Sequence, residues 1–205
     1  MPFSTANLVV QSKGGGQDRI FAKTVEGGVV LVVADGAGGT SNGALAADFV
    51  VRQVELAARG PLASIDPALL LATLDGGLLE KGQGGQSTAV VALVTEQGIR
   101  GASVGDSAAW VVGATEVADL THAQVRKPLL GNGTARPVAF TAGPLGAATL
   151  VLATDGLVKY VPETKIAEAC RHPTLIEVPR RLAGLVRPAK GEPWDDVGVI
   201  VCRRD

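Results

Sequence analysis

Cysteine, histidine and aromatic side chains are scarce in this sequence of 205 residues. It contains two Cys, two His, two Trp, one Tyr and four Phe. Two cysteines are too few for a disulfide framework or a cysteine-rich zinc knuckle, and their scarcity suits a reducing compartment such as the cytoplasm. With so few aromatic rings, the core has to be built from the aliphatic residues Val, Leu, Ile and Ala.

The chain also lacks an excess of charge of either sign and any long apolar run. Lys and Arg number 19 against 20 Asp and Glu, a net charge of −1. This balance gives no electrostatic attraction to nucleic acid or to an anionic membrane, so we expect neither as a partner. Apolar runs such as residues 29–34 have about a third of the ~18 residues that a membrane-spanning helix needs. Residues 1–7 lack the features of a secretory signal, and we expect a cytoplasmic, monomeric protein.

Short runs rich in β-branched residues, each bounded by turn residues, predict nine strands. They cover residues 8–11, 20–23, 28–34, 87–95, 99–104, 108–112, 138–141, 149–154 and 197–202.

Helical spacing of apolar residues predicts four helices. Two of them, over residues 43–59 and 66–77, lie between the third and fourth strands, and two more, over 162–170 and 179–186, precede the last strand. In the second helix Gly76-Gly77 marks the expected end, so Asp75 is predicted to be a helix terminus. The order of the elements favours layered α+β packing over alternating βαβ units.

Four aspartates stand where predicted strands end or begin. Asp35, Asp106 and Asp155 follow apolar strands, and Asp195 precedes the last one. Strand ends can converge at one edge of a sheet, and carboxylates gathered there repel one another, so such a cluster requires a cation. Hard oxygen ligands select Mg²⁺ or Mn²⁺ rather than zinc. Because an Asp-Gly pair alone is more typical of a turn, the metal hypothesis depends on the whole set.

The segments around these aspartates, taken in order, resemble those of the bacterial metal-dependent protein phosphatases (PPM, type 2C). The segments are VVADGAGG at 32–39, GQSTAV at 85–90, VGDS at 104–107, TDGL at 154–157 and DD at 195–196, preceded by KGGGQD at 13–18. The resemblance covers nearly the whole chain. It implies a four-layer α-β-β-α sandwich of two antiparallel sheets flanked by helix pairs. Residues 1–205 would form a single domain with a short flap within about 107–148.

The resemblance implies a set of metal ligands. Asp35 would bridge two Mn²⁺ or Mg²⁺ ions, and the carbonyl oxygen of Gly36 would bind the second ion. Asp155 and Asp195 would complete the shell of the first ion. Asp106 matches the ligand of a third, weaker ion.

Two further residues match the opening motif of the family. Asp18 would hold the water network around the metals and, with Asp35, act in catalysis, while Lys13 would bind the substrate phosphate. Lys13 stands where the family usually has Arg, which loses bidentate recognition of phosphate. Ala37 stands where many eukaryotic members have a His that is proposed to protonate the leaving group.

The implied activity is hydrolysis of phosphoserine and phosphothreonine in proteins by a metal-bridging hydroxide. Such a hydrolase would work in signal transduction, on a protein phosphorylated by a cognate Ser/Thr kinase. A different class of function also remains open: a non-catalytic regulatory module that keeps the fold and binds a phosphoprotein. Lys13, Ala37 and the short flap motivate that alternative, whereas the retained acidic residues favour the enzyme.

Overall fold

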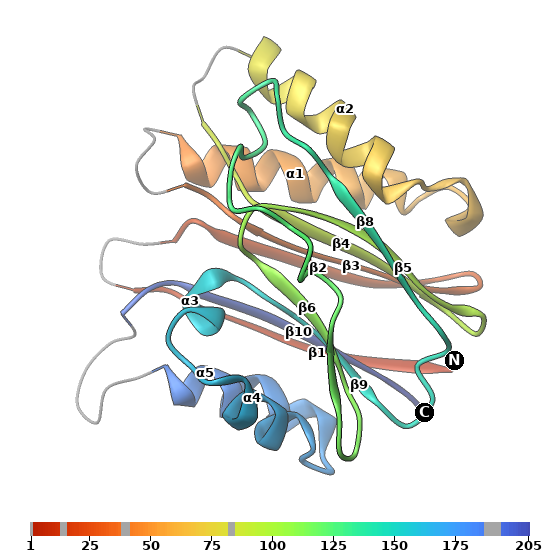
Figure 1. Cartoon of the computed structure of the whole chain (residues 1–205). Helices are drawn as coiled ribbons and strands as arrows, with labels where there is room; N and C mark the ends of the chain where they lie inside the picture. Colours follow the sequence, from red (N-terminus) through yellow and green to blue (C-terminus); the bar gives the residue numbers. More distant parts are fainter. Residues whose placement is uncertain (1, 13–15, 38–41, 82–84, 187–193) are drawn as a thin grey trace.

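Two five-stranded antiparallel sheets form the centre of the molecule (Figure 1). The computed structural model describes residues 2–12, 16–37, 42–81, 85–186 and 194–205. The first sheet has the order β1 (Phe3–Val10), β10 (Val197–Arg204), β9 (Thr149–Ala153), β6 (Ala108–Val112) and β7 (Val117–Asp119). The second has the order β2 (Asp18–Val25), β3 (Gly28–Asp35), β4 (Ala89–Thr95), β5 (Gly98–Val104) and β8 (Val138–Ala142).

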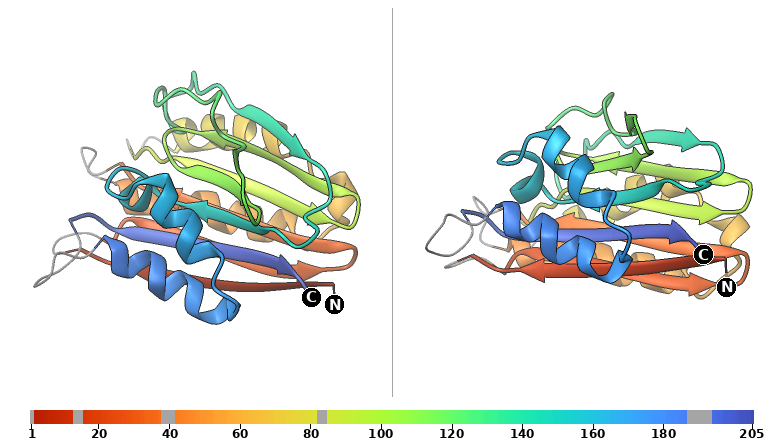
Figure 2. Two further views of the ribbon diagram at one scale, coloured as in Figure 1. Left: turned by 60° about the horizontal axis from the view of Figure 1, so that its bottom comes forward. Right: turned by 90° about the horizontal axis from the view of Figure 1, so that it is seen from below.

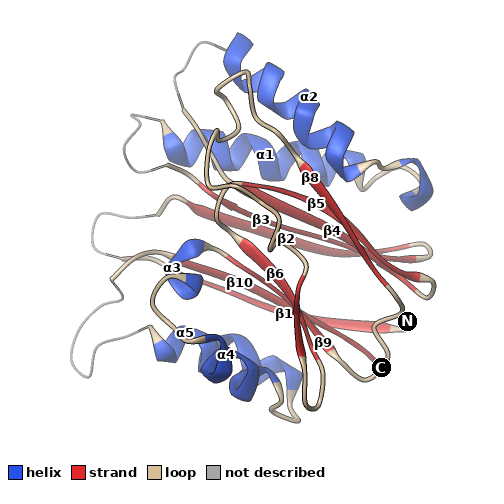
Figure 3. Ribbon diagram, viewed as in Figure 1, coloured by secondary structure: helices blue, strands red, loops and turns tan. Residues whose placement is uncertain are grey.

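Helices cover the outer faces of both sheets, which confirms the predicted four-layer α-β-β-α sandwich (Figure 3). On the second sheet lie α1 (Gly43–Ala57) and α2 (Pro67–Glu80), joined through the short helix η1 (Leu62–Ser64). On the first sheet lie α4 (Glu163–Cys170) and α5 (Val178–Leu185), joined through η2 (Leu175–Glu177) (Figure 2). The single turn α3 (Asp155–Val158) directly follows β9.

The strand β3 shows how one aliphatic sequence serves two layers of the core. Its residues from Val29 to Ala34 are all fully buried. Because side chains alternate along a strand, Val30 and Val32 pack with α1 and α2, whereas Leu31 and Val33 pack against the other sheet. Burying each of these side chains contributes about 1.5–3 kcal/mol. The central strands are therefore held rigidly on both faces, and so are the residues at their ends.

All nine predicted strands are present, with ends that differ by up to five residues. The strand expected at 87–95 begins at Ala89, because Ser87 makes isolated bridges to Gly36 and Leu130 instead. The expected helix at 43–59 ends at Ala57. Among the described residues, four short elements were not predicted, β7, α3, η1 and η2, and all are too short to show a periodic pattern.

The prediction that Asp75 ends a helix is wrong. The helix α2 continues past Gly76 and Gly77 to Glu80, since the missing side chain of Gly77 lets Phe49 of α1 pack closely against it. Asp75 is 5% exposed, and its Oδ1 accepts hydrogen bonds from the backbone N–H groups of Gly131 (2.7 Å) and Gly133 (2.9 Å). Its Oδ2 accepts one from Ala135 N–H at 2.9 Å. Asp75 thus anchors the loop before β8.

In the described part of the chain, no helix is long and apolar enough to cross a membrane. Residues 107–148 contain β6, β7 and β8 and the loops between them. The single domain over 1–205 with a short flap in that region stays a prediction.

Replacing Asp75 by Ala should lower the free energy of unfolding by about 3 kcal/mol, because three backbone N–H groups would lose a buried, charged acceptor. Urea unfolding of Asp75→Ala and of Glu80→Ala, which removes an exposed carboxylate from the same helix, measures this. We expect the control to stay within about 0.5 kcal/mol of the unmodified protein. A loss below about 1 kcal/mol in Asp75→Ala would contradict the anchoring role.

Candidate functional site

The strand ends that carry most of the predicted acidic residues lie at the end of the sandwich opposite the chain termini (Figure 1). Asp18, the first residue of β2, is paired directly with Asp35, the last residue of β3. Asp155 begins α3 immediately after β9, and Asp195 lies two residues before β10. The two sheets therefore each bring carboxylates to the same end.

Asp18 is 3% exposed and is tied to the opposite sheet. The hydroxyl of Thr154, which follows β9, donates a hydrogen bond to Asp18 Oδ2 at 2.7 Å and accepts one from Gly198 N–H at 2.8 Å. Burial and the negative charges of Asp196 and Asp155 raise the pKa of Asp18 to about 7, although the Thr154 hydrogen bond opposes the rise. Thr154 therefore joins the two sheets at the site.

The backbone of Asp35 is fixed by the segment before β4. Its N–H donates to Thr88 Oγ1 (3.1 Å), while its carbonyl oxygen accepts from the Ser87 hydroxyl (2.9 Å) and the Thr88 N–H (2.8 Å). Burial, followed by the charges of Asp18, Asp155 and Asp195, raises the pKa of Asp35 to about 9. These shifts reflect burial of the carboxyl groups first and repulsion by neighbouring carboxylates second.

Two glycines at the site make room for close backbone contacts. A Cβ on Gly36 would lie 2.3 Å from the carbonyl carbon of Gly43, at the start of α1. A Cβ on Gly156 would lie 1.8 Å from the carbonyl oxygen of Asp196. The Asp-Gly pairs at 35–36 and 155–156 are therefore required by packing at the site and do not form hairpin turns.

Asp106 lies beside this cluster and is paired with a cation. It follows Gly105, whose φ of +91° belongs to the left-handed region that favours glycine. The Nε of Arg126 lies 2.6 Å from Asp106 Oδ2. Burial and the charges of Asp106 and Asp195 raise the pKa of Asp155, and Lys159 and Arg126 partly oppose this rise. Asp106, Asp155 and Asp195 therefore interact electrostatically.

Asp196 has a structural role that the sequence did not predict. Its Oδ1 accepts from the N–H (2.8 Å) and hydroxyl (3.1 Å) of Ser12, and its Oδ2 accepts from the N–H groups of Gly16 (2.5 Å) and Gln17 (2.7 Å). Burial alone would raise the pKa of Asp196, but these hydrogen bonds hold it below its usual value. Asp196 thus fixes both flanks of residues 13–15. Lys13 itself lies outside the described residues.

The side chains that meet here are carboxylates, the oxygen donors that a hard divalent ion prefers. Within the described ranges, no group of three or more His, Cys, Asp or Glu side chains is arranged so that it could hold a metal ion by itself. Mg²⁺, however, is usually held by one or two carboxylates together with several waters. Between described residues, no ion pair involves Asp18, Asp35, Asp155 or Asp195. Their repulsion is the kind that a bound cation relieves.

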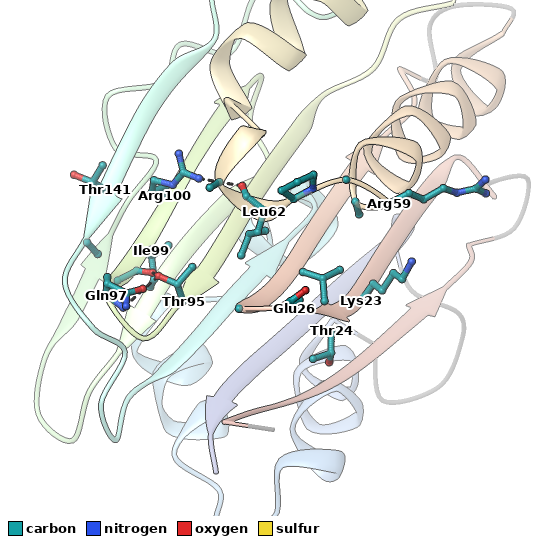
Figure 4. Close-up of a pocket in the computed structure, with 18 residues that line it drawn as sticks. Lys23, Thr24, Glu26, Arg59, Leu62, Thr95, Gln97, Ile99, Arg100 and Thr141 are labelled. Atoms are coloured by element: carbon teal, nitrogen blue, oxygen red, sulfur yellow. Dashed lines mark hydrogen bonds between the residues drawn. The ribbon is translucent and has the colours of Figure 1, made fainter.

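A cavity of about 1260 Å³ lies elsewhere, at the other end of the sheets (Figure 4). It is lined by the β2–β3 turn, the connection between α1 and α2, and the β4–β5 turn, and its charged residues include Lys23, Glu26, Arg59 and Arg100. Asp18 and Asp35 lie at the opposite ends of β2 and β3. The cavity is therefore separate from the acidic cluster and contributes nothing to it.

Comparison with solved structures identifies bacterial phosphatases of the same fold. The serine/threonine phosphatase Stp1 from Staphylococcus aureus has a TM-score of 0.85 at 20% identity, over 100% of this chain and 96% of that one. The S. agalactiae serine/threonine phosphatase has a TM-score of 0.84 at 20% identity, over 99% and 100%. The catalytic domain of the phosphatase PstP, in complex with two manganese ions, has a TM-score of 0.81 at 18% identity, over 99% and 98%.

These similarities confirm the predicted resemblance to the bacterial PPM-type phosphatases at the level of the fold. No protein-family model and no curated protein sequence matches the chain. The roles of Lys13, Asp18, Asp35, Gly36, Asp106, Asp155 and Asp195 stay predictions.

The metal-free protein should lose stability as the pH rises from about 5.5 to 8.5. The folded-state pKa values of Asp18, about 7, and Asp35, about 9, exceed the ordinary value of 3.8, so the folded protein retains protons that the unfolded chain has released. Stability therefore falls through this window. Urea midpoints in the presence of a chelator measure the effect.

Two variants make the test specific. Asp35→Asn should remove most of this pH dependence, because it removes one of the repelling charges, whereas Glu80→Gln should retain it. A midpoint for the unmodified protein that stays constant or rises between pH 5.5 and 8.5 would contradict the interpretation of the cluster.

Proposed function

We propose that this protein is a metal-dependent phosphatase that hydrolyses phosphoserine and phosphothreonine in proteins. The observation that carries the proposal is that the strand ends bring the carboxylates of Asp18, Asp35, Asp155 and Asp195 to one end of the sandwich, where their charges act on one another. This sandwich is the fold of the bacterial serine/threonine phosphatases Stp1 and PstP. The fold supports the reaction class, and the carboxylates support its dependence on metal.

Two Mn²⁺ or Mg²⁺ ions are the proposed cofactors. The presence of two manganese ions in the PstP structure supports this number. Asp35 would lie between the ions, Gly36 would offer its carbonyl oxygen to one, and Asp155 and Asp195 would hold the other. When bound, such ions supply a water nucleophile of lowered pKa and neutralise the phosphoryl oxygens.

The pair formed by Asp18 and Asp35 would release a proton when the metal ions bind. Burial first, and then neighbouring carboxylates, raise the pKa of Asp18 to about 7 and that of Asp35 to about 9, so the metal-free pair would retain a proton near neutral pH. Because bound cations favour the charged form of their ligands, metal binding would release this proton. Asp18, held by Thr154 through its Oδ2, would then accept a hydrogen bond from the attacking water and orient it.

The rest of the reaction uses the flanking residues. Lys13 would pair with a phosphoryl oxygen, while Asp196 holds Ser12, Gly16 and Gln17, the described residues on either side of it in the sequence. The water oxygen forms a new bond to phosphorus as the bond to the seryl or threonyl oxygen breaks. With Ala37 where many eukaryotic phosphatases of this fold have His, the leaving oxygen would take its proton from water, and the products would be inorganic phosphate and the hydroxyl side chain.

The proposed substrate is a protein phosphorylated by a cognate Ser/Thr kinase, and the proposed setting is cytoplasmic signal transduction by a monomer. Near-zero net charge supports a protein substrate over nucleic acid. The alternative function, a non-catalytic module that binds a phosphoprotein, would need the fold without turnover.

Hydrolysis of p-nitrophenyl phosphate and of a phosphothreonine peptide should require Mn²⁺ and should be abolished by a chelator. Asp35→Asn should lower kcat/KM by at least roughly a hundredfold, because it removes a bridging charge. Glu80→Gln, which is exposed on α2, serves as the matched control and should keep full activity. Mn²⁺ binding without turnover would reject the enzyme and leave the regulatory module.

Lys13→Ala should raise KM for the phosphopeptide roughly tenfold with a smaller effect on kcat, because a charge-assisted contact to the phosphate is lost. Lys13→Arg should lower KM, since a guanidinium binds phosphate with two parallel hydrogen bonds. Lys23→Ala, at the far end of β2, is the control. Equal KM values in Lys13→Ala and the unmodified protein would remove Lys13 from the site.

A further inference from the structure

Arg126 brings a positive charge to the edge of the acidic cluster. Its guanidinium Nε lies 2.6 Å from Asp106 Oδ2, and the Arg126 charge also acts on Asp155. Arg126 is 70% exposed and Asp106 28% exposed, measured on their side chains. An ion pair this exposed is held by modest energy and can be displaced.

The loop that carries Arg126 is fastened on both sides. Before it, Gln124 accepts a hydrogen bond from the hydroxyl of Ser103 at 3.1 Å and donates one to the carbonyl oxygen of Val125 at 2.9 Å. After it, Leu130 exchanges two backbone hydrogen bonds with Ser87, whose hydroxyl donates to the carbonyl oxygen of Asp35.

The anchor Asp75 then holds the next residues. Its Oδ1 accepts from the N–H groups of Gly131 and Gly133. The chain on both sides of Arg126 is therefore held in place, and its later side is joined to the segment that fixes Asp35, which keeps the Arg126 side chain within reach of Asp106. If the backbone of this loop made no such hydrogen bonds, the loop would not keep the Arg126 side chain near the acidic cluster.

The guanidinium and a divalent cation compete for the same carboxylate. Asp106 Oδ2 already accepts a charge-assisted contact from Arg126, so an ion that binds Asp106 must displace the guanidinium, share Oδ2 with it or bind Oδ1 close beside it. A guanidinium one carboxylate away would also repel a doubly charged ion.

We propose that Arg126 replaces a third divalent ion at Asp106, so that the chain binds two ions readily and a third only in competition with this side chain. The inference rests on the proposed metal-dependent function. Asp106 would then bind a divalent ion only when the concentration of that ion is high enough to displace Arg126.

Mn²⁺ binding to the full chain, measured by calorimetry and by equilibrium dialysis, tests the proposal without relying on activity. The unmodified protein should bind two ions tightly and a third weakly. Arg126→Ala should bind the third ion more tightly, on the order of tenfold, because both the competing pair and the repulsion are removed. The two tighter ions should change less, since Arg126 forms its ion pair with Asp106 and acts on Asp155 only through a minor charge effect.

Three further variants separate the causes. Lys127→Ala removes the same charge from the neighbouring residue, for which the described contacts include no ion pair with Asp106, and it should leave third-ion affinity close to that of the unmodified protein. Arg126→Lys keeps the charge and should bind the third ion less tightly than Arg126→Ala. Asp106→Asn combined with Arg126→Ala should lose the third ion.

The outcomes are distinct. Equal third-ion affinity in Arg126→Ala and the unmodified protein, or an equal gain in Lys127→Ala, overturns the role of Arg126 while leaving the two-ion site and the proposed function intact. Failure of the unmodified protein to bind any Mn²⁺ overturns both this inference and the proposed function.

Discussion

Repulsion between carboxylates that cannot move apart is the constraint on which the candidate site depends. Asp18 and Asp35 face each other across a β-ladder whose strand β3 is buried on both faces, so the backbone cannot relax to separate them. Burial and the neighbouring charges of Asp155 and Asp195 add to the cost of ionising them. Protonation or a bound cation can relieve that cost, and a metal-dependent hydrolase would use the second.

A second group of aspartates in the same molecule has a different role. Asp75 and Asp196 are about as buried as Asp18, but their carboxylate oxygens accept hydrogen bonds from backbone N–H groups. Those contacts lower the pKa of Asp196, whereas the pKa values of Asp18 and Asp35 are raised. A buried aspartate whose charge is stabilised by backbone N–H donors can organise a loop. A buried aspartate without such donors needs a proton or a cation.

Arg126 belongs to neither group, because it offers the cluster a cationic side chain at Asp106. The framework that holds it runs from Asp75 on α2 through Leu130 to Ser87 and the carbonyl oxygen of Asp35. Structural anchors and proposed metal ligands are thus parts of one hydrogen-bonded network. A substitution of Asp75 on α2 would therefore be expected to alter the position of this loop and, through it, the backbone around Asp35.

The sequence by itself determined the nine predicted strands, the four longer helices, the α+β class and the acidic residues at strand ends, because alternation, helical spacing and turn residues are local signals. It could not show that Asp75 is a buried anchor, since its three partners lie more than fifty residues away. Only the tertiary structure brought Arg126 to Asp106, set Asp196 against Ser12, and used Thr154 to join the sheets. Contacts between residues distant in sequence leave no periodic pattern in the sequence, because they form only when the elements pack together in the folded structure.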